Sequence, residues 1–371
     1  MTSGPSRRRP ISRGKRVVFT ILVVLLVYGV IETVAWRLGR AAELPERVEW
    51  AVDVIRDGGN PFRYAPHPYT LYMPRPGFVG MNGEAQHNSL GFRGEEIAAP
   101  KPPGTFRIVC LGGSTTYSDA VESPSDAYPA QLEAFLRRTT GSTPIEVVNA
   151  GAAAALAADA MVTFAFRVEP IEPDLIVVHT GLNDCEALLA PGLRPDFAHV
   201  RARFVTPRRT AFGRALLRSP TYRLIFSRTV MPVMLFRSFG LDQGQRWADH
   251  PPEPTGYRAS LESLVLMARS RGVRILFANE APRDDFIDDV RFMAALKRLR
   301  AAGEEVAAAH RIAVCHFERF RPPPSFWDAD GVHLRPRGTR EKAAFIGRDL
   351  IRFGLAPPAG PTTRSVSLPG E

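Results

Sequence analysis

The 371-residue chain contains only three cysteines, and no two of them have the spacing of a metal-binding or redox motif. This odd, sparse set predicts no disulfide framework of the kind that stabilises small secreted domains. Cys110 and Cys315 each lie within an apolar run, where cysteine acts as a small hydrophobic residue. A glycine-rich phosphate-binding loop is also missing. We therefore expect neither a metal ion nor a cofactor.

Acidic residues are absent from two segments of the chain. The sequence has 48 basic and 38 acidic side chains, a formal charge of +10. Residues 1–16 hold six of the basic groups and residues 201–237 hold nine arginines, and neither segment contains Asp or Glu. Outside them, acidic residues outnumber basic ones. The excess charge is therefore local. Because neither segment resembles a nucleic-acid-binding motif, we expect no nucleic-acid partner.

One long apolar run is present, at residues 17–38, directly after the basic segment. A helix rises about 1.5 Å per residue, so this run would extend about 33 Å, enough to cross a bilayer. Glu32 lies near one end, and Trp36 suits an interfacial position. The preceding basic residues predict that residues 1–16 form a cytoplasmic arm, with the rest of the chain outside.

The apolar run has two alternative interpretations besides a transmembrane anchor. In the first it is a signal peptide cleaved at Gly39 and Ala41, but Arg40 and the length of the apolar run disfavour cleavage. A buried core helix is disfavoured by the basic residues that precede the run. The sequence thus predicts an uncleaved, single-pass anchor in the cell membrane.

The rest of the chain alternates between predicted strands and helices. Residues 39–104 are expected to form a polar stem and an extended arm rich in proline, glycine and aromatic residues. A regular domain is predicted over residues 105–356. Strands are expected at 106–111, 145–149, 174–179, 273–278 and 312–316, and helices at 127–138, 152–168, 258–271, 291–310 and 340–353. This order predicts a three-layer α/β/α sandwich with a flavodoxin-like parallel sheet.

Two segments depart from the alternation. Residues 186–257 combine apolar residues with arginines, and we interpret them as a helical insertion whose apolar side packs on the domain. The alternative is a basic and apolar surface that lies on anionic lipid beside the anchor. Residues 357–371 are polar with proline and glycine, which predicts a disordered tail.

Glycines and polar residues follow several of the predicted strands. Residues 112–114 are Gly-Gly-Ser, residues 149–151 are Asn-Ala-Gly, and residues 181–184 are Gly-Leu-Asn-Asp. The carboxyl ends of parallel strands meet at one edge of a sheet, so we expect these segments to lie together. Residues 328–333, Asp-Ala-Asp-Gly-Val-His, precede the last predicted helix.

These segments contain the groups that nucleophilic catalysis on an ester requires. A serine hydroxyl needs an adjacent base, and the base needs a third group to orient it. Ser114 follows two glycines at a predicted strand-to-helix turn, and His333 would be its base. Asp330, three residues before His333, can reach the imidazole. The backbone N–H groups of Ser114 and Gly151 and the side-chain amide of Asn183 would stabilise the oxyanion.

In order and spacing, the segments resemble the four conserved blocks of the SGNH (GDSL-type) hydrolases, over about residues 105–355. Residues 111–115, 149–151, 181–184 and 330–333 are similar to the serine, glycine, Gly-x-Asn-Asp and Asp-x-x-His blocks. The resemblance implies a triad of Ser114, Asp330 and His333, with Gly151 and Asn183 in the oxyanion hole. Residues 87–93, His-Asn-Ser-Leu-Gly-Phe-Arg, also look like those of bacterial, membrane-anchored members.

Some residues in these blocks allow another interpretation. Gly113 departs from the family pattern, in which Asp often precedes the serine, and this leaves the geometry of the turn open. Ser114 might instead cap the following helix. Asp328 is a rival to Asp330 as the orienting carboxylate. His179 is interpreted as a buried structural histidine and Asp184 as a helix cap.

The sequence therefore predicts an extracytoplasmic serine hydrolase of the esterase or deacetylase type that forms an acyl-enzyme. Its partner would be an ester-bearing small molecule, lipid or glycan. One alternative is an O-acyltransferase that modifies envelope glycans with the same triad. A second is a non-catalytic module that binds a glycan or lipid on the same fold.

Overall fold

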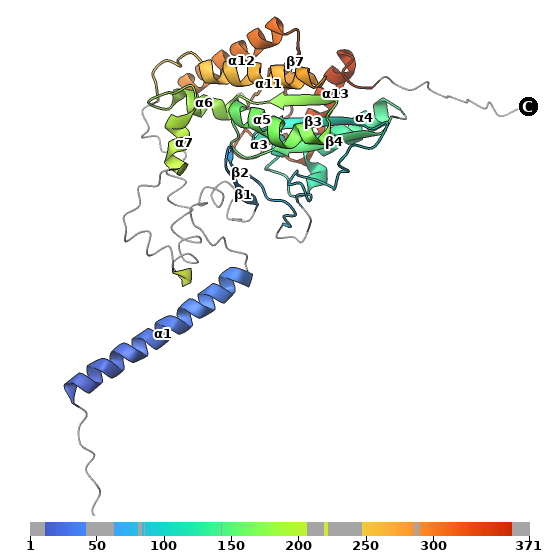
Figure 1. Ribbon diagram of the computed structural model, residues 1–371. Helices are drawn as coiled ribbons and strands as arrows, with labels where there is room; N and C mark the ends of the chain where they lie inside the picture. The colour runs from blue at the N-terminus through green and yellow to red at the C-terminus, as the bar shows by residue number, and fades with distance from the viewer. Residues whose placement is uncertain are drawn as a thin grey trace, which may run out of the picture. The chain divides into compact units, whose positions relative to one another are not determined.

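The computed structural model describes residues 12–41, 63–80, 84, 86–141, 143–205, 219–221, 247–283, 285 and 289–357. Most of the predicted cytoplasmic arm, the stem, much of the insertion and the predicted tail lie outside the described residues. The chain divides into two units, residues 1–62 with 207–236, and residues 63–206 with 237–371 (Figure 1).

The first unit contains α1, Arg13–Ala41, which includes the apolar run predicted at residues 17–38. From Arg13 to Leu38 the helix is long and apolar enough to cross a membrane, with a mean hydropathy of 2.6. A membrane anchor and a signal sequence both have this character. Within the same unit, Glu32 accepts hydrogen bonds from Ser219 Oγ at 2.5 Å and from the N–H of Thr221 at 3.2 Å.

The second unit is built on a parallel sheet with the strand order β4-β3-β5-β6-β7. Each strand lies within two residues of its predicted range, so the predicted parallel sheet is confirmed. The strands are β3 Phe106–Gly112, β4 Ile145–Gly151, β5 Leu175–His179, β6 Arg274–Ala278 and β7 Ala313–Cys315.

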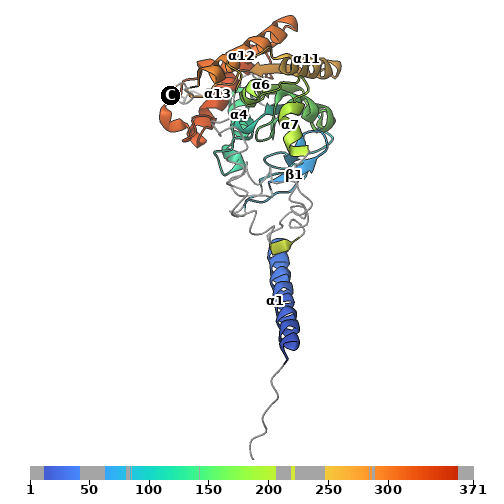
Figure 2. The ribbon, with the colours of Figure 1, turned by 90° about the vertical axis from the view of Figure 1, so that its left-hand side faces the viewer.

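Helices cover both faces of this sheet. Side chains alternate along β3: Val109 and Leu111 pack into the core on one face, whereas Ile108 and Cys110 pack into the core on the other. The first face is covered by α5 Ala157–Thr163, α6 Leu182–Leu189, α11 Thr255–Ser270 and α12 Val290–Ala309. The second is covered by α4 Tyr128–Thr139 and α13 Pro336–Arg352. In both views α11 and α12 lie side by side (Figures 1 and 2). The three-layer α/β/α architecture is thus confirmed.

An N-terminal arm precedes the sheet. Its β1, Tyr64–His67, and β2, Leu71–Pro74, form an antiparallel hairpin. Further along the arm, Arg93 forms an isolated antiparallel bridge with Asn149 of β4. The arm is therefore attached directly to the edge strand, as an extended segment with turns.

The helix predicted at 152–168 is wrong at its start. Residues 152–156 form a turn, and α5 begins only at Ala157 and continues as a π-helical turn over Phe164–Val168. Alanine favours helix, but the arm engages this turn: the N–H of Ala153 donates to Tyr64 Oη at 3.0 Å, and Tyr72 Oη donates to the carbonyl of Ala153 at 2.5 Å. These tertiary contacts override the local preference. The insertion contains α7, Ala198–Val205.

Asp184 links α6 to the start of α5, because its carboxylate accepts the N–H of Ala157 at 3.1 Å. Only 1% of Asp184 is exposed. Burial raises the pKa of its carboxyl to about 7, although hydrogen bonds partly oppose the shift. Between about pH 4 and 7 the folded chain therefore holds a proton that the unfolded chain releases, and stability falls as the pH rises through this range.

Replacing Asp184 with Asn should remove this pH dependence. We expect Asp184→Asn to stabilise the full chain by about 1–4 kcal/mol at pH 8, and to change stability little at pH 4, where Asp184 is already neutral. Thermal unfolding in detergent at the two pH values measures the difference. Asp196→Asn, at an exposed carboxylate, is the control. An equal effect of Asp184→Asn at both pH values would contradict the prediction.

Candidate active site

The carboxyl ends of β3, β4 and β5 are packed unusually closely. Gly112 is in register with Gly151 on one side and with His179 on the other. A Cβ at Gly112 would lie 2.2 Å from the carbonyl oxygen of His179, and a Cβ at Gly151 would lie 2.3 Å from the backbone nitrogen of Tyr117. Neither position has room for a side chain. The two glycines therefore let the residues after β3 lie directly on the strand ends.

Ser114 is the first residue of α3, Ser114–Tyr117, a four-residue helix that follows β3 almost immediately. The N-cap of this helix is Gly113, so Ser114 does not have the capping role considered from the sequence. Ser114 is partly exposed. Neither its N–H nor its hydroxyl has a hydrogen-bond partner among the described residues.

Asn183 reaches this turn from the first turn of α6. Its Nδ2 donates to the carbonyl of Ala155 at 3.0 Å. A Cβ at Gly113 would lie 2.4 Å from the same nitrogen. The absence of a side chain at position 113 thus allows the Asn183 amide to lie against the residue that precedes Ser114. The structure therefore places Asn183 beside the turn that carries Ser114.

Gly151 differs from its predicted role. Its N–H donates to Asn149 Oδ1 at 3.0 Å, so this group is already engaged and does not face an oxyanion. The glycine instead provides space for the backbone of α3. In the following turn, Ala154 has a left-handed φ of 48°. Its N–H makes no hydrogen bond with the described residues, a feature that sequence patterns did not reveal.

Asp330 and His333 lie together in the loop before α13. Asp330 Oδ2 accepts a hydrogen bond from His333 Nδ1, and Oδ1 accepts the N–H groups of Val332 and His333, both at 2.9 Å. The rival carboxylate, Asp328, instead accepts a hydrogen bond from Arg335 at 3.5 Å. The structure therefore places Asp330, and not Asp328, on the imidazole.

These contacts change the ionisation of both groups. Burial opposes the charge of Asp330, but the hydrogen bonds from His333 and the two N–H groups outweigh it and hold the pKa of the carboxyl at about 2. Burial likewise opposes the imidazolium form of His333, but the bond to Asp330, together with the charges of Asp119, Asp330 and Glu280, raises its pKa above the usual range. Asp330 is thus a carboxylate at neutral pH.

The second ring nitrogen of His333, Nε2, is buried and has no hydrogen-bond partner among the described residues. His333 and Thr115 line the same cavity of about 300 Å³, together with aromatic side chains that include Phe317 and Trp327. Thr115 follows Ser114 directly. In the described part of the chain no hydrogen bond joins Ser114 Oγ to Nε2. Such bonds are often loose in a free enzyme and tighten when substrate binds.

Side chains of the arm make hydrogen bonds with the segment that follows α3. The guanidinium of Arg93, 5% exposed, donates from NH1 to the carbonyls of Tyr117 and Ser118, both at 2.9 Å. From NH2 it donates to those of Val121 and Glu122, at 2.7 and 3.1 Å. His87 Nε2 shares a 2.8 Å hydrogen bond with the hydroxyl of Tyr117. From the sequence, His87 and Arg93 stood out only as the two ends of the segment that resembles bacterial, membrane-anchored members.

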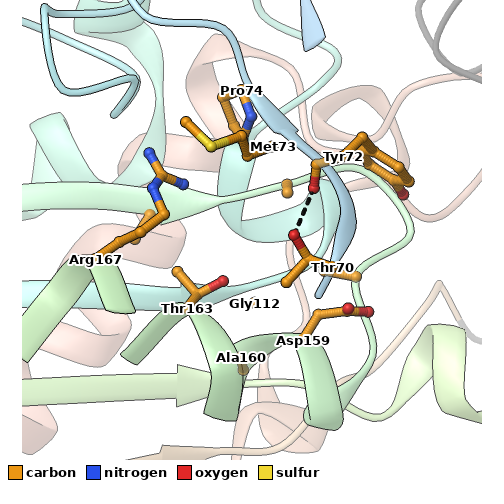
Figure 3. Close-up of a pocket in the computed structure, with 12 residues that line it drawn as sticks. Thr70, Tyr72, Met73, Pro74, Gly112, Asp159, Ala160, Thr163 and Arg167 are labelled. Atoms are coloured by element: carbon orange, nitrogen blue, oxygen red, sulfur yellow. Dashed lines mark hydrogen bonds between the residues drawn. The ribbon is translucent and has the colours of Figure 1, made fainter. Parts of the chain in front are cut away.

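A crevice of about 390 Å³, partly open to solvent, lies between the arm and the ends of β3 and β4 (Figure 3). In Figure 3, Thr70 and Tyr72 approach it from the arm, whereas Asp159 and Arg167 approach it from α5 and the π-helical turn. Ala155, which accepts from Asn183, also lines it. The crevice therefore adjoins the oxyanion side of the candidate site.

Sequence analysis missed Glu280 and Lys342, which also line the cavity of His333. Glu280 accepts a hydrogen bond from Thr115 Oγ1 at 2.5 Å, and Lys342 Nζ donates to the carbonyl of Thr115 at 3.0 Å. A signal for Glu280 was present, because a polar pair, residues 279–280, directly follows the strand predicted at 273–278. His179 is fully buried and donates from Nδ1 to the carbonyl of Ala278 at 3.0 Å, in accord with a structural role.

One group in the described part of the chain has the composition of a metal site. The ligand atoms of Glu304, His316 and Glu318 all lie within 4.8 Å of one another. However, Asn279 Nδ2 donates to both carboxylates at 3.0 Å, and a 2.8 Å hydrogen bond joins His316 Nδ1 to Glu318. These polar groups thus satisfy one another, and we assign them no ion.

Residues 110–341 match the sequence model of the GDSL-like Lipase/Acylhydrolase family. None of the curated proteins matches the chain. Among solved structures, a lipase/acylhydrolase from Enterococcus faecalis is 18% identical, with a TM-score of 0.43, over 66% of this chain and 95% of that chain. Axe2, an acetylxylan esterase from Geobacillus stearothermophilus, is 16% identical, with a TM-score of 0.42, over 66% and 94%.

The family match covers more than half of the chain and includes every residue of the predicted triad and oxyanion hole. The five-stranded parallel sheet between helical layers accords with it. The protein therefore belongs to the GDSL-like lipase/acylhydrolase family, whose members hydrolyse esters, and has the SGNH hydrolase fold.

Proposed function

We propose that this protein is an extracytoplasmic serine esterase that uses Ser114 as nucleophile, His333 as general base and Asp330 as the orienting carboxylate. The observation that carries the proposal is the hydrogen bonding of the two ring nitrogens of His333. Its Nδ1 is held by Asp330, whereas its Nε2 is buried without a partner in a cavity shared with the residue after Ser114. A base needs this arrangement, with one nitrogen fixed and the other available.

In the proposed reaction, Ser114 Oγ attacks the carbonyl carbon of an ester as His333 Nε2 takes the hydroxyl proton. The tetrahedral intermediate collapses, and the alcohol leaves with the proton from His333. An acyl-enzyme on Ser114 remains. Water, deprotonated by His333, then attacks this ester and releases the acid and the free serine. Asp330 stays ionised throughout and stabilises the imidazolium in each half-reaction.

The proposed oxyanion donors are the N–H of Ser114, the Asn183 amide and the N–H of Ala154. A primary amide has two hydrogens, so Asn183 can donate one to Ala155 and keep the other for substrate. The N–H groups of Ser114 and Ala154 have no partner among the described residues. Ala154 thus replaces Gly151, whose N–H is engaged by Asn149. The substrate is an ester-bearing small molecule, lipid or glycan.

The proposed location follows from the sequence and from α1. Residues 17–38 anchor the chain, residues 1–16 are cytoplasmic, and the stem leads to the hydrolase domain, residues 105–356, outside the cell membrane. The large apolar side chains of α1 are exposed from Val17 to Leu38, and basic residues precede them. Such a surface is stable in lipid and not in water.

Replacing the nucleophile should abolish hydrolysis. We expect the full chain in detergent to hydrolyse short-chain p-nitrophenyl esters, and Ser114→Ala to lower kcat by about 10³-fold or more. Release of p-nitrophenol measures the rate, and thermal unfolding verifies the fold. Ser270→Ala, at an exposed serine of α11, is the matched control and should retain activity. Equal activity of Ser114→Ala and wild type would exclude the proposed nucleophile.

The two carboxylates before His333 should differ in importance. We expect Asp330→Asn to lower kcat/KM by about 10²–10⁴-fold, because the imidazole loses its orientation and its counter-charge. Asp328→Asn should retain most of the activity. His333 must be neutral to act as a base and its pKa is raised, so wild-type kcat/KM should fall as the pH drops through that pKa. The reverse order of effects at the two positions would assign the orienting role to Asp328.

The anchor can be tested by fractionation of cells that produce the full chain. We expect the protein to remain in the membrane fraction after an alkaline carbonate wash, and its mass to correspond to the uncleaved chain. Deletion of residues 1–38 behind an export signal should release the protein into the soluble extracytoplasmic fraction. A mature N-terminus near residue 41 in the wild type would show instead that the apolar helix is a cleaved signal.

A further inference from the structure

Two oppositely charged side chains are buried beside the nucleophile turn. Glu280 follows β6 and is 4% exposed, and Lys342 lies on α13 and is 2% exposed. Both bind Thr115, the residue after Ser114: Glu280 Oε1 accepts from its hydroxyl at 2.5 Å, and Lys342 Nζ donates to its carbonyl at 3.0 Å. Two elements distant in sequence therefore hold one residue of the turn through its two polar groups.

Charges buried to this extent need a partner or a function, because removing them from water is costly. Burial raises the pKa of Glu280 and lowers that of Lys342 to about 8, and the charge of each partly opposes the shift of the other. The ammonium of Lys342 also lies 4.4 Å from the ring centroid of Tyr128 and 5.1 Å from that of Phe317. The two charges thus compensate each other in part, although burial still disfavours both of them.

His333 lines the same cavity as Thr115, Glu280 and Lys342. Three acidic groups act on its imidazole. Asp330 comes from its own loop, Asp119 from the segment after α3, and Glu280 from the end of β6. Asp119 is paired with Arg63 of the arm.

Two further groups, His179 and Arg300, lie next to Glu280. His179 of β5 lies with Nε2 3.3 Å from the Glu280 carboxylate, but complete burial lowers its pKa and keeps it neutral. Arg300 of α12 donates to the backbone carbonyl of Glu280 at 2.8 and 2.5 Å. Among the described residues of the elements packed against Glu280, only Lys342 and Arg300 thus carry a permanent positive charge near it. His333 carries a further positive charge when its imidazole is protonated.

We propose that Glu280, held by Lys342, is a positioning residue of the active site that fixes the turn bearing Ser114 and stabilises the imidazolium form of His333. This inference rests on the proposed function. The imidazolium forms during each proton transfer from the nucleophile, and a fixed negative charge at the cavity wall lowers its free energy. The ammonium of Lys342 stabilises the buried carboxylate of Glu280, and its hydrogen bond orients the carbonyl of Thr115.

The test separates charge from shape. Glu280→Gln keeps an acceptor for Thr115 Oγ1 and removes the negative charge. In the full chain in detergent, we expect the pKa of His333, followed by NMR of its imidazole, to fall by about 0.5–1 unit. The acid limb of kcat/KM for p-nitrophenyl acetate should shift by the same amount. Glu318→Gln, at a partly exposed carboxylate near the same sheet edge, should leave both unchanged.

Glu280→Gln leaves Lys342 buried without a counter-charge, which disfavours folding. The double variant Glu280→Gln with Lys342→Met removes both charges at similar volume. Its downward shift should be smaller than that of Glu280→Gln, because the loss of the ammonium offsets part of the effect. An unchanged His333 titration in a folded Glu280→Gln or double variant would overturn the inference. The NMR titration does not require turnover, so it stays interpretable if Ser114→Ala shows that the proposed function is wrong.

Discussion

The close approach of three parallel strand ends determines where the chemistry of this protein takes place. Gly112 and Gly151 have no space for a Cβ, because the carbonyl of His179 and the backbone of α3 occupy it. As a result α3 begins two residues after β3 and lies directly against the ends of β3 and β4. Ser114 is then presented at the sheet edge with its N–H unused. A larger residue at either glycine would lift the turn away from Asn183.

The N-terminal arm is a second constraint on the same turn. The segment after α3 leaves several carbonyls unpaired by secondary structure, and buried carbonyls need donors. Arg93 supplies them from one side chain. In the turn after β4, Tyr72 donates to the carbonyl of Ala153 and Tyr64 accepts the N–H of the same residue. The family match begins at residue 110, but the structural support of the site begins with the arm at residue 63. The arm is therefore part of the site's architecture and not only a linker.

The parts of the structure that depend on local pattern were predictable. Buried parallel strands are short apolar runs, and all five strands were found from them. The motifs at the strand ends likewise indicated Ser114, Asn183 and the pair before α13. Two kinds of contact account for the errors. The arm unwinds the start of an alanine-rich helix through tertiary hydrogen bonds, whereas Asn149, only two residues away, takes the N–H of Gly151 through a local one. Lys342 looked like one of many charged residues on an amphipathic helix, and only the packed fold shows that it is buried.

Gly113 and Glu280 are best understood together. Relatives often carry Asp before the serine, but here a Cβ at position 113 would meet the Asn183 amide at 2.4 Å. A carboxylate on this backbone would therefore displace the amide proposed to bind the oxyanion. Glu280 reaches the turn from the opposite side, through the hydroxyl of Thr115, and leaves Asn183 in place. The carboxylate beside the nucleophile turn therefore belongs to the cavity wall in this protein. Because Lys342 compensates it there, the serine can keep both an amide donor and a nearby carboxylate.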